Sequence, residues 1–327
     1  MVEGQPSSAG SWGCPSTMLR MVPLPEPGRI RVTEADFLAR LRALPLHSAA
    51  RGLLDDTALI ATTPLVVTTD TMVEGVHFLP GDPPADVAWK LVATNLSDLA
   101  AKGATPEGIL LNYPLSGAAW DENFLAGLAE ILTAHDCPLI GGDTVTLPVG
   151  APRILTVTAF GRDAAAPSRS GARPGDALYV TGTIGDAGAG LAIARGAAGP
   201  AALLAAYRRP IPRLVEGRLL AAQAHAMMDV SDGLLIDAAR MAAASGVAIT
   251  IDLAAIPLSP AYATWSGDRL AAATAGDDYE LLLAAAPGLD GPVTRIGDMT
   301  EGSGLTLTDH GKPIALPQRL GYQHARS

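Results

Sequence analysis

The chain has 327 residues, of which 48% are hydrophobic and 17% are charged, and its formal net charge is −10. This size indicates a globular protein of about two domains, and the negative charge argues against a surface for nucleic acid or anionic membranes, which needs clustered Lys and Arg. No apolar run reaches the roughly 18 residues of a membrane span, and Cys14 and Cys137 give neither a disulfide framework nor a zinc spacing. We therefore expect a cytoplasmic protein without nucleic-acid or membrane partners.

The N-terminal half is expected to follow an extension. Residues 1–29 are rich in Pro, Gly and Ser and lack the apolar segment of a secretion signal, which predicts disorder. Residues 30–162 form the first predicted domain. Its helices are expected at Thr33–Leu44, Asp86–Lys102 and Trp120–Ala134, and its strands at Ala58–Ala61, Leu65–Thr69, Ile109–Tyr113, Pro138–Ile140 and Arg153–Phe160.

A stretch rich in Gly, Pro, Arg and Ser, Arg162–Asp176, marks the predicted boundary to a second domain at residues 163–327. Helices are expected there at Asp186–Arg195, Ile211–Ala224 and Leu234–Ala244, and strands at Ala177–Thr181, Val247–Leu253, Tyr279–Ala284, Val293–Gly297, Leu305–Thr308 and Pro313–Leu316, with a short apolar segment at Met227–Asp229. Helices and strands alternate irregularly in both halves, so we expect an α+β, or mixed α/β, fold.

Six acidic clusters are the most informative feature. Five are expected in short turns with Gly, Ser or Thr, whereas Asn95 and Asp98 are polar residues within the apolar pattern of the helix expected at Asp86–Lys102. The six clusters are Leu54-Asp55-Asp56, Thr68-Thr69-Asp70, Asn95-Leu96-Ser97-Asp98, Gly141-Gly142-Asp143-Thr144, Asp229-Val230-Ser231-Asp232-Gly233 and Gly276-Asp277-Asp278-Tyr279-Glu280. Any one of them is also ordinary turn or capping chemistry, and Asp232 is a plausible helix N-cap. Asp70, Asp143 and Asp229 are expected where apolar strands end, the position at which α/β active sites are built. Taken together, the clusters favour a centre with several metal ions.

No P-loop occurs in the chain, and lysine is scarce, occurring only at Lys90, Lys102 and Lys312. Divalent cations would then have to carry the positive charge toward phosphates. Mg²⁺ suits this role because it takes one or two carboxylates and keeps other positions for water and phosphate oxygens. The pattern predicts a Mg²⁺-dependent phosphotransferase that uses ATP without a Walker motif, in which metal ions neutralise charge on the transferred group.

Three further features leave alternatives open. Arg169 is either a phosphate-binding fork of donors or a solvated linker side chain. His77 is either structural or part of the site, because it follows Asp70 by seven residues in a short loop. The glycine-rich stretch Gly182–Gly190 lacks the G-x-G-x-x-G spacing of a dinucleotide site, so we expect a tight turn between a strand and a helix.

In their order, the motifs closely resemble the thiamine-monophosphate kinase family of the aminoimidazole-ribonucleotide-synthetase-like superfamily. The resemblance rests on Asp55–Ala58, Thr68–Phe78, Asn95–Ala104, Leu139–Thr144, Arg169–Asp176, Asp229–Leu234 and Gly276–Leu281, and it extends from about Phe37 to Tyr322. It implies a homodimer of two-domain α/β subunits, in which the N-terminal strands form a barrel across the dimer. It also implies transfer of a phosphoryl group from ATP to thiamine monophosphate, giving ADP and thiamine diphosphate.

The resemblance assigns roles by position in the motifs. Implied ligands of Mg²⁺ are Asp56, Thr68, Thr69, Asp70, Asp98, Asp143, Asp229 and Asp232, of which Asp98, Asp143, Asp229 and Asp232 are the expected catalytic residues. Implied ATP contacts are Gly142, Asp143, Arg169 and Ser231, and implied contacts of thiamine monophosphate are His77, Asp277 and Tyr322. The chain departs from the family at Leu54, where Gly is usual, at Asp277, where Glu is usual, and at Thr68, where Ser is common.

Other members of the superfamily remain as alternatives. Aminoimidazole-ribonucleotide synthetase, an ATP-dependent ligase, is the closest rival, but the His77-Phe78 pair and the Asp277–Leu281 stretch favour the thiamine enzyme. Selenophosphate synthetase needs a Lys near an N-terminal Cys, which Cys14 lacks, and the hydrogenase-maturation relative ends in a Cys. A non-catalytic sensor of nucleotide or thiamine phosphate is a further alternative. It is disfavoured because buried carboxylates without cations are costly.

Overall fold

Residues 34–47, 65–162 and 164–323 are described by the computed structural model, and all of them belong to one compact unit. None of the helices in these ranges combines the length and apolar character that crossing a membrane requires. The predicted extension at residues 1–29, the predicted strand Ala58–Ala61 and the acidic pair Asp55-Asp56 lie outside the described residues.

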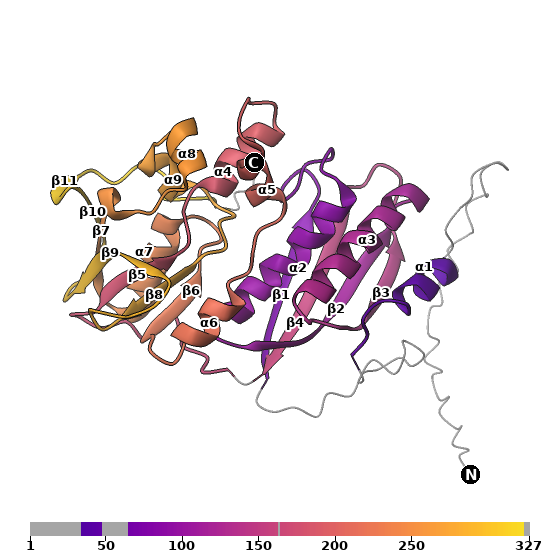
Figure 1. The fold of residues 1–327 in the computed structure, drawn as a ribbon, viewed down its shortest axis with the longest axis horizontal. Helices are drawn as coiled ribbons and strands as arrows, with labels where there is room; N and C mark the ends of the chain where they lie inside the picture. The colour runs from indigo at the N-terminus through magenta and orange to yellow at the C-terminus, as the bar shows by residue number, and fades with distance from the viewer. Residues whose placement is uncertain (1–33, 48–64, 163, 324–327) are drawn as a thin grey trace, which may run out of the picture. The chain divides into compact units, whose positions relative to one another are not determined.

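The strands form two mixed sheets (Figure 1). The first sheet has the order β1-β4-β2-β3 and consists of β1 (Val66–Val73), β2 (Thr105–Leu115), β3 (Leu139–Thr146) and β4 (Ile154–Arg162). The second has the order β11-β10-β7-β9-β5-β8-β6 and consists of β5 (Ala177–Thr181), β6 (Ala226–Asp229), β7 (Ala248–Asp252), β8 (Leu281–Ala285), β9 (Val293–Thr300), β10 (Gly304–Asp309) and β11 (Lys312–Ile314). Parallel pairs (β2 with β3, β7 with β10) occur beside antiparallel ones, so the predicted mixed α/β class is confirmed.

The helices are α1 (Glu34–Leu41), α2 (Pro84–Ala100), α3 (Ala118–Ala134), α4 (Asp186–Ala194), α5 (Ala201–Arg208), α6 (Leu214–Leu220), α7 (Leu234–Ser245), α8 (Pro260–Trp265) and α9 (Arg269–Thr274), with a 3₁₀ turn η2 at Leu253–Ala255. Helix α2 begins at Pro84, which suits a first helical turn because its missing N–H would be unpaired there. Helices α2 and α3 lie over one face of the first sheet (Figure 1). Helix α2 also contacts β6 and α6, so it is the element that lies between the two sheets.

The two sheets share a hydrophobic core. Alternate residues of a strand point to opposite faces of its sheet, and β5, β6 and β8 are buried on both faces. Met227 and Leu283 pack in one cluster with Leu96 of α2, whereas Met228 and Leu282 pack in a second cluster with α7. One face of the second sheet is therefore covered by the N-terminal half of the chain. The domain limits at residues 30–162 and 163–327 stay a prediction, although Arg162 does end the first sheet.

Several strands are longer than predicted, and two of these extensions change the setting of two acidic clusters. The strand predicted at Leu65–Thr69 continues to Val73, and the one predicted at Pro138–Ile140 continues to Thr146. Asp70 and Asp143 consequently lie inside strands, so the prediction that they sit in turns at strand ends is wrong. The polar residues are tolerated in the strands because Thr69 and Asp143 lie on the exposed face of the sheet, whereas Thr68 and Asp70 face polar residues of α2. Asp229, in contrast, ends its strand as predicted.

The helices differ from the prediction as well. Helices α5, α8 and α9 have no counterpart in the predicted pattern, and the helix predicted at Ile211–Ala224 is reduced to α6. Each of the three additional helices has eight or fewer residues, too short to display a full apolar stripe. Cys137 is buried, and burial, with a smaller effect of Asp136, raises the pKa of its thiol to about 12. Such a thiol is protonated and unreactive at neutral pH.

Candidate active site

Four side chains from three elements meet beside helix α2, and we call Thr68, Asp70, Asp98 and Asp229 the carboxylate cluster. Thr68 and Asp70 lie two residues apart on β1, so both point toward α2. Thr68 Oγ1 donates a hydrogen bond to Asp98 Oδ2 of α2. The backbone N–H of Asp70 donates to Asn95 Oδ1 at 3.1 Å. Asn95 and Asp98, which are polar residues within the apolar pattern of α2, thus connect this helix to β1.

Asp229 reaches the cluster from the second sheet. It follows Met227 by two residues on β6 and therefore points to the same face, toward α2. There Asp229 Oδ2 accepts a hydrogen bond of 2.7 Å from Ser97 Oγ, and Ser97 is fully buried. The cluster thus joins carboxylates that lie far apart in the sequence and belong to different sheets.

The charges of the cluster repel one another. Burial, the charge of Asp98 and smaller effects of Asp237 and Asp70 raise the pKa of Asp229 to about 8, against the hydrogen bond from Ser97. Burial and the charge of Asp98 raise the pKa of Asp70 to about 6. Burial also raises the pKa of Asp98, although the hydroxyl of Thr68 opposes this. Three carboxyl groups with raised pKa values in one place are a candidate functional site, because at neutral pH they do not all ionise unless cations compensate their charge.

Two basic residues of the chain contribute to this balance. Lys102 Nζ donates to the backbone carbonyls of Pro167 and Met227, at 2.9 and 3.2 Å. The charges of Lys102 and Arg169 both lower the pKa of Asp98. Burial, and then the charge of Arg169, lowers the pKa of Lys102 itself. Arg169 is exposed, so its guanidinium is accessible at the edge of the cluster.

The loop after β6 is organised by Asp237, a residue that the sequence did not single out. Its Oδ2 accepts from the backbone N–H groups of Ser231 and Asp232, at 3.0 and 3.1 Å. Arg240 Nη1 donates both to Asp237 Oδ1 and to Asp232 Oδ2. Asp232 does not cap α7, whose N-cap is Gly233, so the capping alternative is wrong. The backbone of Tyr322 donates to Asp232 O at 2.8 Å, which brings the C-terminal segment onto this loop.

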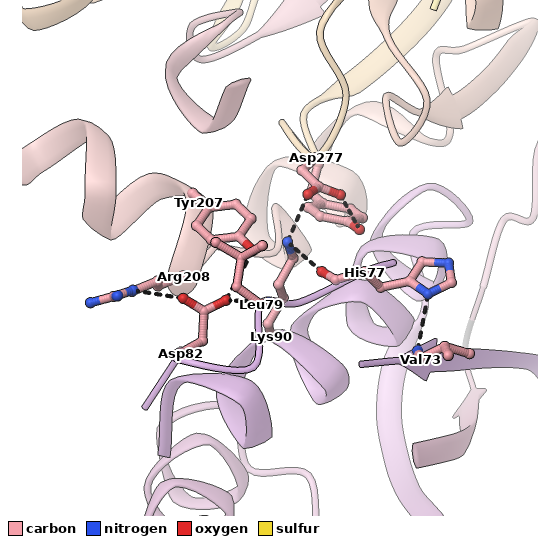
Figure 2. A network of polar contacts seen from close by, with 9 residues as sticks. Val73, His77, Leu79, Asp82, Lys90, Tyr207, Arg208 and Asp277 are labelled. Carbon is pink, nitrogen blue, oxygen red and sulfur yellow. Dashed lines mark hydrogen bonds and ion pairs between the residues drawn. The ribbon is translucent and has the colours of Figure 1, made fainter. Parts of the chain in front are cut away.

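Asp277 lies in a segment that is fixed to helix α2 by Lys90 (Figure 2). Lys90 Nζ donates to Asp277 Oδ2 at 2.7 Å and to the backbone carbonyl of His77 at 3.3 Å. His77 Nδ1 accepts from the backbone N–H of Val73 at 3.0 Å, so a neutral ring carries its proton on Nε2. Two of the three residues expected to contact thiamine monophosphate, His77 and Asp277, are therefore linked through one ammonium group.

The residues after Asp277 are anchored one by one. Asp278 is half-buried and accepts from the N–H of Gly185 with both oxygens, at 3.0 Å. Glu280 forms an ion pair with Arg213 and accepts from Thr181 Oγ1 at 2.7 Å. The glycine-rich stretch at residues 182–190 is thus a turn whose N–H groups bind Asp278, in agreement with the structural interpretation of that stretch.

Tyr279 connects this segment to the carboxylate cluster. Its hydroxyl donates to Asp277 Oδ1 at 3.1 Å. Its pKa is raised well above the usual value, first by burial and then by the charges of Asp277, Asp229 and Asp70. The carboxylate cluster and Asp277, a predicted contact of thiamine monophosphate, therefore lie in one region of the molecule.

Three predicted site residues lie away from the cluster within this chain. Asp143 pairs with Asn112 at the far edge of the first sheet, three strands from β1, and faces away from α2. The hydroxyl of Thr69 also lies on that outer face, where it accepts from Thr158 Oγ1. Gly142 has a clear structural role, since a Cβ there would lie 1.9 Å from Leu111 O. Asp56 lies outside the described residues.

Residues 34–47, 65–162 and 164–323 contain no group of three or more His, Cys, Asp or Glu side chains close enough together to hold a metal ion. In the carboxylate cluster, hydroxyl donors from Thr68 and Ser97 occupy one oxygen of Asp98 and one of Asp229. The donor set is nevertheless of the type that Mg²⁺ takes, because carboxylate and hydroxyl oxygens are hard ligands. The residues present fit Mg²⁺ in the chemistry of their donor atoms, and the metal-ligand assignments stay predictions.

Sequence reasoning missed Lys90, Ser97, Asp237 and Tyr279 as parts of the site. Lys90 and Ser97 carried a readable signal, since they are polar residues within the apolar pattern of a buried helix. A buried polar residue requires a partner, so both could have been selected on that ground. Asp237 carried the same signal within helix α7, whereas Tyr279 carried none, because its position depends on loop geometry.

Comparison with known proteins defines the class of this fold and site. Residues 54–162 match the family described as AIR synthase related protein, N-terminal domain, and residues 173–310 match AIR synthase related protein, C-terminal domain. These two spans cover more than half of the chain. The chain therefore belongs to the AIR synthase related family.

Within this family the similar proteins are thiamine-monophosphate kinases, as the motifs predicted. The thiamine-monophosphate kinase of Caulobacter vibrioides is 40% identical over 326 residues, covering 89% of this chain and 91% of the relative. A crystal structure of the enzyme from Stenotrophomonas maltophilia has a TM-score of 0.71 at 38% identity, covering 80% of this chain and 91% of that one. A structure described as AaThiL complexed with AMPPCP and TMP also has a TM-score of 0.71, at 32% identity, covering 82% of this chain and 91% of that one.

Proposed function

We propose that this protein transfers the γ-phosphoryl group of ATP to thiamine monophosphate and forms thiamine diphosphate and ADP. The observation that carries the proposal is the convergence of Asp70, Asp98 and Asp229 from two sheets and the helix between them. The thiamine-monophosphate kinase relatives, among them a structure described as a complex with AMPPCP and TMP, agree with this activity.

Magnesium ions are part of the proposal. The carboxylates of Asp70, Asp98, Asp229 and Asp232 and the hydroxyl of Thr68 would hold them, together with Asp56, Thr69 and Asp143, which the family motifs indicate. When bound, Mg²⁺ neutralises the negative charge of the phosphates and of the transferred group. The raised pKa values of Asp70 and Asp229 support this assignment, because bound cations are what would make these groups ionise together.

The chain's own residues bind and orient the two substrates. Arg169, exposed beside the cluster, offers a fork of N–H donors to ATP, with Ser231, Gly142 and Asp143 as the further contacts that the motifs indicate. His77, Asp277 and Tyr322 are proposed to contact thiamine monophosphate. Phosphoryl transfer needs little covalent assistance, so holding the acceptor phosphate in line with the γ-phosphate provides much of the rate enhancement.

We also propose a homodimer in which the first sheets of two subunits pack together and form the barrel that the family resemblance implies. Helices α2 and α3 cover one face of the first sheet, while the opposite face carries Val67, Val145 and Ile154, which are 55%, 47% and 45% exposed. These three side chains share a face because the strand register aligns them. Asp143 lies on the same face, so dimerisation would bring it next to a second subunit.

The test is a direct assay of the purified full-length protein with ATP, Mg²⁺ and thiamine monophosphate, in which thiamine diphosphate is followed by chromatography. Product that depends on both substrates and disappears with EDTA supports the kinase. Thermal stabilisation by both ligands without product would instead identify a sensor. If neither ligand has an effect, the substrate assignment is wrong, and aminoimidazole-ribonucleotide ligase chemistry is the next assay.

A further inference from the structure

Lys90 is a deeply buried basic residue that contacts two of the predicted substrate-binding residues. Its side chain is 4% exposed, and its ammonium lies 4.1 Å from the centre of the Tyr207 ring. It is one of only three lysines in the chain. A lysine is rarely buried so completely unless its charge is paired, and here the pairing carboxylate is Asp277.

The contacts of Lys90 join two segments that are 200 residues apart. One N–H donates to the carbonyl of His77, in the loop after β1, and another to the carboxylate of Asp277, before β8 (Figure 2). Both segments are anchored elsewhere: His77 Nδ1 accepts from Val73 N, and Asp277 N donates to Ser231 O at 2.8 Å. The ammonium therefore fixes the separation between two already ordered segments.

The Asp277 carboxylate is restrained at both oxygens. Oδ2 accepts from Lys90, and Oδ1 accepts from the hydroxyl of Tyr279 at 3.1 Å. The backbone is left-handed at Asp277, with φ of 69°, and at Tyr279, with φ of 52°. Residues other than Gly disfavour this conformation, so it persists where the surroundings hold it. A carboxylate with 32% of its side chain exposed is thus presented in one direction.

We infer that Lys90 is a positioning residue for thiamine monophosphate, because its ammonium sets the direction of the Asp277 carboxylate and its distance from His77. This inference rests on the proposed function, in which His77 and Asp277 contact that substrate. Lys90 acts through Asp277 and the His77 loop, so it determines the affinity for the acceptor substrate and leaves the ATP end of the site unchanged.

The test measures steady-state kinetics of the full-length protein with each substrate varied separately. Lys90→Met removes the charge at similar length, and we expect KM for thiamine monophosphate to rise about 10- to 100-fold, the cost of losing a charge-assisted hydrogen bond. KM for ATP should change by less than about twofold. Lys90→Arg, which keeps the charge, should recover most of the loss. Tyr279→Phe, which removes the second restraint on Asp277, should raise the same KM about 3- to 10-fold.

Arg209→Met is the matched control. Arg209 pairs with Asp86 at 2.5 Å and lies 5.2 Å from the Trp89 ring, so it has the same two kinds of partner near the start of α2. The loss of an ion pair and of a ring contact at the start of α2 is common to Arg209→Met and Lys90→Met, whereas positioning affects only the latter. The inference is wrong if Lys90→Met keeps the wild-type KM for thiamine monophosphate. It is also wrong if KM for thiamine monophosphate and KM for ATP rise equally.

Two further outcomes are also decisive. If Lys90→Met does not fold, Tyr279→Phe decides, because this variant lacks only one oxygen atom. A rise in KM for thiamine monophosphate alone supports the inference, and unchanged KM values refute it. If the wild-type protein makes no thiamine diphosphate, the proposed function fails. Thermal stabilisation by thiamine monophosphate then serves as the readout, and the inference survives only if that stabilisation exists and is lost in Lys90→Met.

Discussion

Ser97 of helix α2 donates a 2.7 Å hydrogen bond to Asp229, the last residue of β6, and both side chains are buried. This contact crosses from the half of the chain that forms the first sheet to the half that forms the second. It is also the interaction that favours the ionised form of Asp229 against burial and neighbouring negative charge.

Ser97→Ala should therefore lower the affinity for Mg²⁺ while the protein still folds. Removing the hydroxyl leaves a buried carboxyl without its donor, which costs about 1–3 kcal/mol of stability. It also raises the pKa of Asp229 further, so more Mg²⁺ should be required for half-maximal activity. Magnesium titrations of the variant and of Ser168→Ala, an exposed serine, measure the difference. An unchanged magnesium requirement in Ser97→Ala would contradict the role assigned to this hydrogen bond.

Asp98→Asn should abolish turnover and preserve the fold. The amide can still accept from Thr68, so the packing of α2 on β1 survives, but the charge that would bind a metal ion is lost. We expect kcat to fall by at least about 10³-fold, since charge stabilisation in the transition state is worth several kcal/mol.

The control for Asp98→Asn is Asp298→Asn, which removes an exposed carboxylate that pairs with Arg295 on the surface. Circular dichroism and thermal melting should show that both variants fold. Near wild-type turnover in Asp98→Asn would refute the assignment of Asp98 as a metal ligand.

The metal-free protein should lose stability as the pH rises. The folded-state pKa values of Asp70 and Asp229 are about 6 and 8, above the ordinary value of 3.8. Between 3.8 and about 8 the folded protein therefore binds more protons at these groups than the unfolded chain does, and the free energy of unfolding decreases with pH. Asp229→Asn removes the larger part of this dependence.

Thermal melting in EDTA between about pH 5 and about pH 8 measures the effect. Wild-type Tm should fall relative to that of Asp229→Asn as the pH rises, and Mg²⁺ at the upper pH should restore more stability to the wild-type protein than to the variant. Parallel Tm curves of the two proteins across this range would show that Asp229 is not the group responsible.

The outer face of the first sheet should be a subunit interface. Val67 is exposed on β1 and lies beside Phe160 of β4 in the strand register. Val67→Glu places a charge on this face without touching the core, so a dimer should dissociate while the monomer keeps its helical content. Sedimentation analysis of the wild-type protein and of Val215→Glu, at an exposed valine on α6, completes the comparison. A wild-type protein that sediments as a monomer would refute the proposed dimer.

The chemistry of the site was more predictable from the sequence than its geometry. The motifs correctly indicated the family, and Asp98 and Asn95 were recognised as polar residues on a helix otherwise apolar on its buried side. Asp70 and Asp143 were placed in turns because Thr, Gly and Asp are common there, but the pairing of β1 and β3 with neighbouring strands overrides that preference.

The contacts that cross between the sheets could not be predicted. Periodicity shows which residues face a core, but it does not show which distant strand supplies the other side of that core. Asp229 with Ser97, and Lys90 with Asp277, both depend on the packing of α2 against the second sheet. Among the site residues, Tyr279 was the least predictable, because its position depends on a left-handed backbone at a residue other than Gly.

Helix α2 carries Lys90, Asn95, Ser97 and Asp98 within three turns. Each residue of an α-helix advances the direction of a side chain by about 100°, so the spacing between Lys90 and Asp98 also sets the angle between their contacts. Inserting or deleting one residue between them would turn one group away from its partner, whichever residue was added. The length of this segment, as well as its composition, is therefore under constraint, and point substitutions at its apolar positions should be tolerated far better than any change of register.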